Sequence, residues 1–450
     1  MGRIQIILYL LILSFSVRAQ VPRLLITTDI GGDPDDQQSL VRLMVYSNEF
    51  DIEGIVTSAS GTPGELQEAV VRPDLVEEII QGYQAVYPNL LKHDANFPDP
   101  KYLFSIVKKG NPLRGWEHVG EGHDTEGSNW IIQRVDKKDK RPLNICIFGG
   151  QTDLAQALWK VKNTRSAKEY NRFMAKIRVY DINDQDKIFR QMYSENRLPF
   201  YILARAPEGV DKREGAYRGI YLGGDESLTS IEWLKQNVLE NHGPLGKLYP
   251  TKTWTEPNPH AAMKEGDTPS WFFFLENGLN IAEKPELGGW GGRFVKNEEG
   301  VYRDAADTYN GKTEARATVY RWRKDFQNDW AARMDWCVGD FKDCNHAPVA
   351  VVNGSKDRNP IRIKAKSGKT VVLDASASFD PDNDGLSFEW FFYPEIPEIN
   401  ETAILKAEGA KAFIRLEHSN AAKCLSLLLR VTDDGEPRLV SYKRILIKCK

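Results

Sequence analysis

The 450-residue sequence has no surplus of charge of either sign, only five cysteines, and no strong hydrophobic run beyond its N-terminus. Its 60 basic and 63 acidic residues give a formal net charge of −3, which leaves no electrostatic excess for a phosphate backbone and argues against a dedicated nucleic-acid binder. Hydrophobic residues make up 41% and charged residues 27%, so a disordered chain, a coiled coil and a polytopic membrane protein all fit poorly. The length suits one large α/β domain plus a module of about 100 residues.

The one hydrophobic run follows Arg3 and covers residues 4–13, and the small residue Ala19 ends a segment suited to signal-peptidase cleavage. This run is too short to span a bilayer comfortably. We therefore predict a secretory signal over residues 1–19, with an uncleaved membrane anchor as the alternative. Its removal takes away Arg3 and Arg18 and no acid, which changes the formal charge from −3 to −5. The mature protein is predicted to be secreted or periplasmic and free of the membrane.

Export makes disulfides feasible for the cysteines. Cys424 and Cys449 flank two apolar strands that share the turn 433–437, which predicts a cross-strand disulfide, with two buried thiols as the alternative. Cys337 and Cys344 enclose a short polar segment and form a second candidate pair. Cys146 lies in an apolar run and is predicted to be a packed thiol rather than a nucleophile.

The first part of the chain alternates strand and helix patterns. Its strand candidates are residues 23–28, 52–57, 143–148, 177–180, 200–204 and 219–222. Helical spacing follows the first strand, at Leu40, Leu43 and Met44, and the third, over residues 153–161. Repeated βαβ units predict a mostly parallel sheet with helices on both faces, within a domain that extends over residues 20–345.

A change of composition marks the end of this domain. Residues 313–336 are predicted to form a helix whose apolar side chains, spaced by three or four, face the core: Val319, Trp322, Phe326, Trp330 and Met334. Beyond residue 348 the chain contains short strand patterns separated by turns, at 370–373, 386–393, 412–416, 425–432 and 439–447. Such a pattern predicts a small all-β sandwich over residues 346–450.

The acidic loop at 27–37 (TTDIGGDPDDQ) is the most informative segment, because a strand gives way there to a helix. It carries four carboxylates, which would repel one another strongly without a cation or a network of donors: Asp29, Asp33, Asp35 and Asp36. Hard divalent cations prefer several oxygen ligands, and open α/β sheets place ligands at the carboxyl ends of their strands. A helix N-cap accounts for one or two of these acids but not for four. The loop therefore predicts a metal or substrate site.

This loop resembles the N-terminal signature of the nucleoside hydrolases, and residues 148–155 (FGGQTDLA) are similar to their second, Gly-Thr-Asn-like loop. A closer resemblance is to secreted bacterial nucleoside-hydrolase-like proteins described as cellulose-binding. Their features match here in order at 122–128 (GHDTEGS), 242–246 (HGPLG), 265–270 (EGDTPS) and 288–293 (GGWGGR). The resemblance covers nearly the whole mature chain. It implies a nucleoside-hydrolase-like α/β domain followed by an immunoglobulin-like sandwich of the polycystic-kidney-disease (PKD) type.

The resemblance also implies a calcium ion held by Asp29, Asp36 and the backbone carbonyl around Thr152, with Asp35 directed toward sugar hydroxyls. In the hydrolases, the aspartate that matches Asp29 activates a metal-bound water, which attacks an anomeric carbon with oxocarbenium character. A nucleoside or sugar is the substrate that this chemistry implies.

The chain departs from the hydrolase pattern at one motif. Those enzymes carry His-Asp-Pro-Leu, whose aspartate is a further calcium ligand, whereas this sequence has glycine after His242, at Gly243. Asp267, in the downstream Gly-Asp-Thr-Pro loop, is the candidate replacement. Without a replacement, the site would bind metal weakly or keep sugar binding without hydrolysis.

Other polar and aromatic residues are candidates for the site. His242 is interpreted as a leaving-group acid or a sugar contact, with an ordinary turn residue as the alternative. Asp124 and Glu126 lie in a glycine-bounded loop that suits substrate hydrogen bonds, or a solvated turn. Trp290 is a candidate to stack on a sugar or base, and Arg293 to bind beside it, unless their glycine-rich loop only marks tight packing.

Two further acidic segments are weaker candidates. Asp184 and Asp186 follow a strand candidate, and solvated loop acids are the favoured interpretation. Residues 380–385 (DPDNDG) begin like an EF-hand loop, but the twelfth place, which needs a bidentate acid, is Phe391. A turn is therefore the default there, with calcium binding as the alternative.

We therefore predict an exported, calcium-dependent hydrolase of N-glycosyl (ribonucleoside-like) or related glycosyl bonds, in which Asp29 is the base, Asp36 the principal metal ligand and Asp35 the sugar ligand. The alternative is a non-catalytic carbohydrate-binding protein that retains the hydrolase fold and binds a polysaccharide such as cellulose. A third interpretation is a purely structural surface protein.

Overall fold

The computed structural model describes residues 21–60, 69–252, 262–366, 368–393, 395–396, 403–416 and 424–449, the last range without the side chains of Cys424 and Cys449. The predicted secretory signal lies outside these residues. None of the helices in the described part of the chain is both long enough and apolar enough to cross a membrane.

An eight-stranded sheet forms the centre of the larger domain, in the order β3-β2-β1-β4-β5-β6-β8-β7. Its strands are β1 (Arg23–Thr28), β2 (Asp51–Thr57), β3 (Val107–Lys109), β4 (Leu143–Ile147), β5 (Ile177–Ile182), β6 (Tyr201–Ala204), β7 (Phe294–Lys296) and β8 (Tyr302–Asp304). All neighbours are parallel except β7 and β8. Strand order runs outward from β1 in one direction and from β4 in the other. The β1–β4 boundary is therefore a topological switch point, where open α/β sheets bind ligands.

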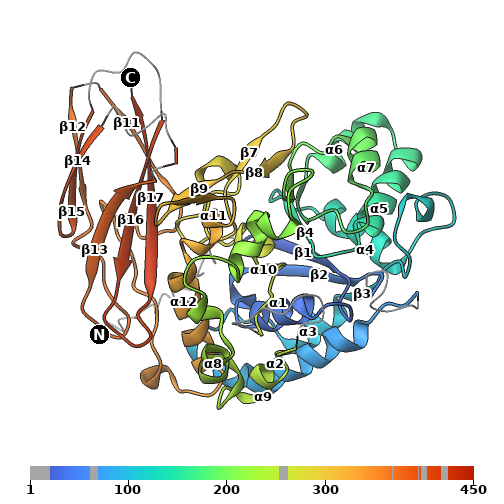
Figure 1. The fold of residues 1–450 in the computed structure, drawn as a ribbon, viewed down its shortest axis with the longest axis horizontal. Helices are drawn as coiled ribbons and strands as arrows, with labels where there is room; N and C mark the ends of the chain where they lie inside the picture. The colour runs from blue at the N-terminus through green and yellow to red at the C-terminus, as the bar shows by residue number, and fades with distance from the viewer. Residues whose placement is uncertain are drawn as a thin grey trace, which may run out of the picture.

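Helices cover both faces of this sheet (Figure 1). They are α1 (Asp35–Met44), α2 (Pro73–His93), α3 (Pro100–Ser105), α4 (Glu126–Asp136), α5 (Gln151–Thr164), α6 (Ala167–Met174), α7 (Phe189–Asn196), α8 (Ile231–Leu234), α9 (Gly243–Lys247), α10 (Thr268–Phe272), α11 (Ala317–Tyr320) and α12 (Arg323–Asp335). Alternate residues of β1 explain the two layers. Leu24 and Ile26 pack in a core with α1 and α2, whereas Leu25 packs in a second core with α4 and α5. The predicted mostly parallel sheet with helices on both faces is confirmed.

Two local predictions differ from the structure. The run 219–222, predicted as a strand, forms none: residues 219 and 220 end a 3-10 helix, η4 (Ala216–Ile220), and a turn follows. A Cβ at Gly219 would lie 2.3 Å from the carbonyl oxygen of Arg316, so this segment is packed against the α11 region. The predicted long helix at 313–336 is divided into α11 and α12, after a hairpin of β9 (Asp307–Tyr309) and β10 (Lys312–Glu314). Its five predicted core side chains are all buried.

The C-terminal domain is a sandwich of two sheets, ordered β11-β17-β16-β13 and β12-β15-β14. Its strands are β11 (Ile361–Ala365), β12 (Thr370–Asp374), β13 (Ser387–Phe392), β14 (Ala403–Glu408), β15 (Lys411–Leu416), β16 (Cys424–Thr432) and β17 (Val440–Cys449). The five predicted strand segments all appear. β11 and β14 were not predicted, because charged residues divide their short apolar patterns, Arg362 and Lys364 in β11 and Lys406 and Glu408 in β14.

The two domains share a continuous buried interface. Tyr393 and Tyr442 of the sandwich belong to the larger domain's core, and the Tyr393 ring stacks on Trp322 at 6.0 Å between centroids. The Asp325 carboxylate on α12 accepts hydrogen bonds from the Tyr442 hydroxyl and from Arg430. The sandwich is therefore packed directly on α12 (Figure 1).

The cysteine predictions have mixed outcomes. Cys146 is a buried free thiol, as predicted, and Cys337 and Cys344 are also free thiols, so the second candidate disulfide is not formed. The backbone register of β16 and β17 sets Cys424 opposite Lys448. The side chains of Cys424 and Cys449 lie outside the described residues, and that disulfide stays a prediction.

Candidate functional site

The acidic loop lies at the topological switch point, between the end of β1 and the start of α1. Beside it, Gly149 and Gly150 join β4 to α5. The Thr27 hydroxyl donates to the Gly149 carbonyl at 2.5 Å and connects the two loops. A Cβ at Gly149 would lie 2.4 Å from the carboxyl carbon of Asp29, so only glycine lets this carboxylate approach the loop after β4.

Three carboxylates from two distant segments converge at this place. Asp35, Asp36 and Asp267 each have an oxygen within 4.8 Å of the others. Asp267 stands at the start of α10 and is buried. The Thr28 hydroxyl donates to one oxygen of Asp36. We call Asp29, Asp35, Asp36 and Asp267 the acidic cluster.

Burial and mutual repulsion disfavour the charged forms of these carboxylates. Burial raises the pKa of Asp29 to about 6, although Arg114 opposes this shift. Burial and then the charges of Asp29 and Asp35 raise the pKa of Asp36 well above its ordinary value. Asp267 has its pKa raised in the same direction, first by burial and then by Asp36 and Asp35. A group of this kind is stabilised by a positive charge placed among the oxygens.

The unmet hydrogen-bonding capacity of the acidic cluster fits a divalent cation. Both carboxylate oxygens of Asp267 and Oδ1 of Asp29 are buried without a hydrogen-bond partner among the described residues. Unpaired buried carboxylate oxygens are costly, and an all-oxygen donor set is the one that calcium prefers. Asp35, Asp36 and Asp267, whose oxygens converge, could therefore hold such an ion, with Asp29 as a neighbouring charge.

Arg114 and Asp186 complete the surroundings of Asp29. Nη2 of Arg114 donates to Asp29 Oδ2 at 2.6 Å, and its Nε lies 3.9 Å from Asp186 Oδ1. Asp186 in turn accepts hydrogen bonds from the backbone nitrogen and hydroxyl of Thr152, at 2.8 and 2.6 Å. Thr152 thus lies one side chain away from the Arg114–Asp29 pair, in the first turn of α5.

Sequence reasoning did not identify Arg114, which lies in a loop without a recognisable motif. Asp184 and Asp186 were considered, but the favoured interpretation was solvated loop acids, whereas both are buried. Their place directly after β5, a parallel strand of the same sheet, was the signal that could have favoured the site.

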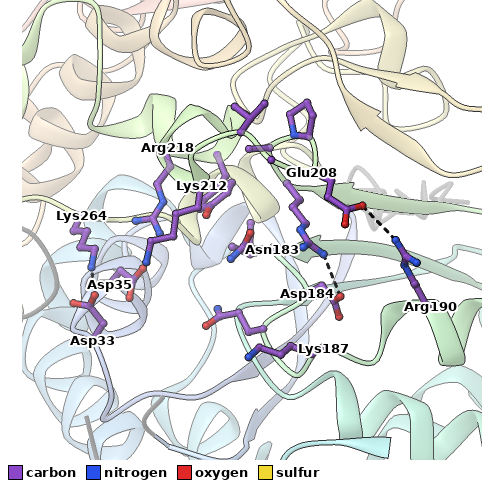
Figure 2. Close-up of a pocket in the computed structure, with 18 of the residues that line it drawn as sticks. Asp33, Asp35, Asn183, Asp184, Lys187, Arg190, Glu208, Lys212, Arg218 and Lys264 are labelled. Carbon is purple, nitrogen blue, oxygen red and sulfur yellow. Dashed lines mark hydrogen bonds and ion pairs between the residues drawn. The ribbon is translucent and has the colours of Figure 1, made fainter. Parts of the chain in front are cut away.

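A pocket of about 990 Å³ opens beside Asp35 (Figure 2). Its walls come from the loops after β1, β5 and β6, from η4 and from the segment before α10. Asp33, the remaining acid of the loop, forms an ion pair with Lys264 at the pocket edge. Burial lowers the pKa of Lys264 to about 8, against the opposing effect of Asp267. The pocket is large enough for a glycosyl group and its leaving group.

His242 lies away from the acidic cluster. It stands at the N-cap of α9, where its Nε2 is 3.1 Å from Asp335 Oδ1. A Cβ at Gly243 would face Val86 and Val338, in apolar packing. The His-Gly-Pro-Leu segment therefore begins an ordinary short helix, and the further carboxylate near the cluster comes from Asp267 instead.

Asp124 and Glu126 form ion pairs outside the acidic cluster. Asp124 accepts from Gln156 at 2.8 Å and from Lys160 at 2.5 Å. Glu126 begins α4 and pairs with Lys108 at 3.2 Å. Their loop precedes a helix whose N-terminus is closed by a capping box, so the pattern reflects helix initiation.

Trp290 and Arg293 are structural in this fold. Trp290 is 3% exposed, packs edge-on against Phe272, and lies at the contact with the sandwich residue Tyr442. Arg293 donates to Asp307 at 2.8 Å and is buried. The glycines around Trp290 permit close packing, since a Cβ at Gly291 would lie 2.3 Å from the backbone nitrogen of Phe273.

Comparison with known proteins places the chain among nucleoside hydrolase-like proteins. The family described as cellulose-binding Sde182, nucleoside hydrolase-like domain, matches residues 23–294. The family described as the C-terminal domain of cellulose-binding protein Sde0182 matches residues 370–449. The first match spans more than half of the chain, and the chain therefore belongs to the cellulose-binding Sde182 family of nucleoside hydrolase-like proteins.

A solved structure agrees with this assignment. A nucleoside hydrolase-related hypothetical protein from Saccharophagus degradans, described as associated with carbohydrate metabolism, is 34% identical and has a TM-score of 0.80. The similarity covers 96% of this chain and 100% of that one. Three domains of mouse protocadherin PcdhgC3 are 19% identical over 25% of this chain and 36% of their own, with a TM-score of 0.17 that supports no conclusion. No curated protein matches the chain.

Proposed function

We propose that the protein is an exported, calcium-dependent hydrolase of N-glycosyl bonds of the ribonucleoside type or of related glycosyl bonds. The observation that carries this proposal is the position of Asp267. It brings a carboxylate with two unpaired buried oxygens to Asp35 and Asp36, at the switch point of a nucleoside hydrolase-like sheet. Carboxylates buried together are costly to ionise, and a bound cation that offsets this cost would also be placed to act on a ligand in the adjoining pocket.

The residues of the acidic cluster take different roles. Asp35, Asp36 and Asp267 would hold the calcium ion, which when bound would polarise an attacking water and orient sugar hydroxyls. Asp29 accepts the proton of the attacking water. Arg114 holds Oδ2 of Asp29 at 2.6 Å, which leaves the unpaired Oδ1 for this transfer. Asp35, at the pocket edge, also accepts hydrogen bonds from sugar hydroxyls.

The test is hydrolysis by the purified full chain of a panel of ribonucleosides and aryl glycosides, with calcium and with a chelator. We expect release of base or aglycone that depends on calcium and is lost in Asp29→Asn. Glu126→Gln serves as the matched control, because Glu126 pairs with Lys108 outside the acidic cluster. A protein that binds calcium but releases nothing from the whole panel would overturn the catalytic proposal.

A second function, carbohydrate binding without turnover, is favoured by the family's description as cellulose-binding and by the distance of His242 from the acidic cluster. Without a nearby histidine, the leaving group lacks the acid that the sequence predicted for it. Sedimentation of the full chain with insoluble cellulose tests this function. Binding that persists in Asp29→Asn, together with no turnover by the wild type, would favour the second function over the first.

A further inference from the structure

The pocket beside the acidic cluster has a basic wall. Six of its lining residues are cationic and four are acidic: Lys187, Arg190, Arg205, Lys212, Arg218 and Lys264 against Asp33, Asp35, Asp184 and Glu208. Three of these acids form ion pairs across the wall, with Lys264, Arg205 and Arg190. The fourth acid, Asp35, belongs to the acidic cluster. The rest of the pocket therefore presents a surplus of positive charge toward any ligand.

Part of this surplus lies on the side of the pocket that holds Asp35. Figure 2 shows Lys212 and Arg218 on that side, together with Lys264, whereas Lys187 and Arg190 lie on the opposite side. A Cβ at Gly266 would lie 3.3 Å from Asp35 Oδ2 and 3.4 Å from the ring of Tyr217, the neighbour of Arg218. Asp35 and the Tyr217–Arg218 wall are therefore separated by no more than the space beside one glycine. One sugar ring could contact both.

Tyr217 and Arg218 hold unused hydrogen-bond donors in the pocket wall. The Tyr217 side chain is 1% exposed, and its hydroxyl has no hydrogen-bond partner among the described residues. Arg218 donates to the Tyr221 hydroxyl at 2.5 Å, and its buried Nε also has no acceptor there. Its guanidinium lies 4.9 Å from the centre of the Tyr217 ring, which fixes its plane. Buried donors without acceptors are costly, and both side chains line the pocket, so a small turn toward an oxyanion bound there would satisfy both donors.

The loop that forms the opposite wall is held in a defined shape. Asn183, Asp184 and Lys187 have φ angles of +68°, +53° and +59°, in the left-handed region that non-glycine residues seldom adopt. The Asp184 carboxylate accepts the backbone N–H of Phe189 at 2.9 Å and stabilises this conformation. This wall of the pocket is therefore preformed.

We propose that the ligand of this pocket is an acidic sugar, a glycosyl group that carries a carboxylate or a phosphate. A hydroxyl of the sugar contacts Asp35, and the oxyanion binds Arg218, Lys212 and the Tyr217 hydroxyl. Arginine suits both anions, because its planar fork of N–H groups matches their paired oxygens. The placement of the sugar at Asp35 rests on the proposed function, but the preference for an anion does not require turnover. Neutral cellulose and simple nucleosides lack the group that this wall would bind.

Calorimetry on the full chain tests this proposal, with D-glucose, D-glucuronate and D-glucose 6-phosphate as probes at one ionic strength and with calcium present. We expect at least one acidic sugar to bind about tenfold more tightly than glucose, which corresponds to about 1.4 kcal/mol. The carboxylate and phosphate probes distinguish the two sources of the anion. Equal affinity for all three probes, or no measurable binding of either acidic one, would overturn the proposal.

Variants test whether the preference for an acidic sugar comes from the basic wall of the pocket. Lys212→Gln changes an exposed side chain and should reduce the preference for the acidic sugar without unfolding the protein, and Arg218→Gln should reduce it further. Lys324→Gln, the same change at an exposed position on α12, should leave it unchanged. If Lys324→Gln lost the preference for the acidic sugar to the same extent, the preference would come from the overall charge of the protein, which would contradict the proposal. Asp29→Asn should keep the preference, so a failure of the proposed hydrolysis is distinguishable from a failure of this inference.

Discussion

Among the described residues, two groups of three aspartates have oxygens within 4.8 Å of one another, one group in each domain. Asp35, Asp36 and Asp267 meet at the end of β1, and Asp380, Asp382 and Asp384 share one loop of the sandwich. In the sequence, the second group has the more regular spacing and begins like an EF-hand loop. By proximity alone, the two groups are equivalent candidates for a cation.

They differ in how their oxygens are used. In the sandwich, Asp380 Oδ1 accepts the backbone N–H groups of Asp382 at 2.7 Å and of Asp384 at 3.3 Å, and only its Oδ2 is buried without a partner among the described residues of this group. The Asp382 carboxylate pairs with His346 at 3.0 Å. In the acidic cluster, Asp267 is buried and neither of its oxygens has a partner among the described residues. Carboxylates that already accept backbone N–H groups stabilise a loop, whereas buried carboxylates without donors require a cation or a proton.

The largest test of this comparison removes one carboxylate from each group. Asp36→Ala should weaken calcium binding by at least about 100-fold, because ligand and charge are lost together. Asp384→Ala should leave calcium affinity and stoichiometry unchanged. Titration calorimetry of the full chain measures both. A loss of one bound calcium in Asp384→Ala would show that the sandwich loop is also a cation site and would end the distinction.

The next effect concerns catalysis within the acidic cluster. Asp29→Asn keeps the size of the side chain but cannot accept a proton, so turnover should fall by about 10²–10⁴-fold. Initial rates of base or aglycone release give this number for any substrate that the wild type accepts. Asp382→Asn, the same chemical change in the sandwich loop, should leave the rate unchanged. An unaltered rate in Asp29→Asn would remove Asp29 from the role of base.

A third test uses pH. Burial raises the pKa of Asp29 to about 6 from its ordinary value of 3.8, so the folded protein binds this proton more tightly than the unfolded chain does. In calcium-free buffer this group costs no stability below about pH 4, the cost grows between about pH 4 and pH 6, and it is constant above that range. For the acidic cluster we expect this destabilisation to be on the order of 1–3 kcal/mol and to disappear when calcium is added. Urea unfolding at several pH values gives the free energy of unfolding as a function of pH. Its change with pH should be smaller in Asp36→Ala than in the wild type, and unchanged in Asp384→Ala.

A smaller effect is expected in the sandwich loop. Asp382→Asn removes the charge partner of His346, in a pair that is partly exposed, and should lower the free energy of unfolding by about 1 kcal/mol. Calcium affinity should not change. The thermal midpoint without calcium reports the loss of stability. The rise of the midpoint on adding calcium reports calcium binding, and we expect an equal rise in the variant and the wild type.

The smallest effect is expected at His242. Because its imidazole pairs with Asp335 away from the acidic cluster, His242→Gln should change neither calcium affinity nor turnover. A large loss of turnover with unchanged affinity would return His242 to the role of leaving-group acid.

The fold was largely predictable from the sequence. Apolar, β-branched runs such as 23–28 and 143–148 bounded by glycine loops predict buried parallel strands, because both faces of each strand must be apolar. The place of the acidic loop at the carboxyl end of the first strand followed from the same pattern, and with it the importance of Asp29, Asp35 and Asp36. The prediction failed where the pattern is short and mixed. The run 219–222 suits a strand or a helical turn equally well.

From the residues alone, the candidate site was predictable only where they are adjacent in the chain, and Asp267 became a candidate through the family resemblance. Asp29 and Asp36 share one loop, and their density alone predicts a site. His242 and Trp290 stood out through local motifs, but the motif at His242 begins a helix and Trp290 fills a core. Arg114 carried no local signal, because its role depends entirely on which loop lies opposite.

The sequence by itself determined the division into an α/β domain and a β-sandwich, and the acidic loop at the end of the first strand. Both are consequences of local periodicity and of charge density, which short segments express without help from the rest of the chain. Only the tertiary structure decided which carboxylates meet, with Asp267 beside Asp36 and Gly243 against Val86. It also decided which acids lack donors, because burial and hydrogen bonding are properties of the packed molecule and not of any segment.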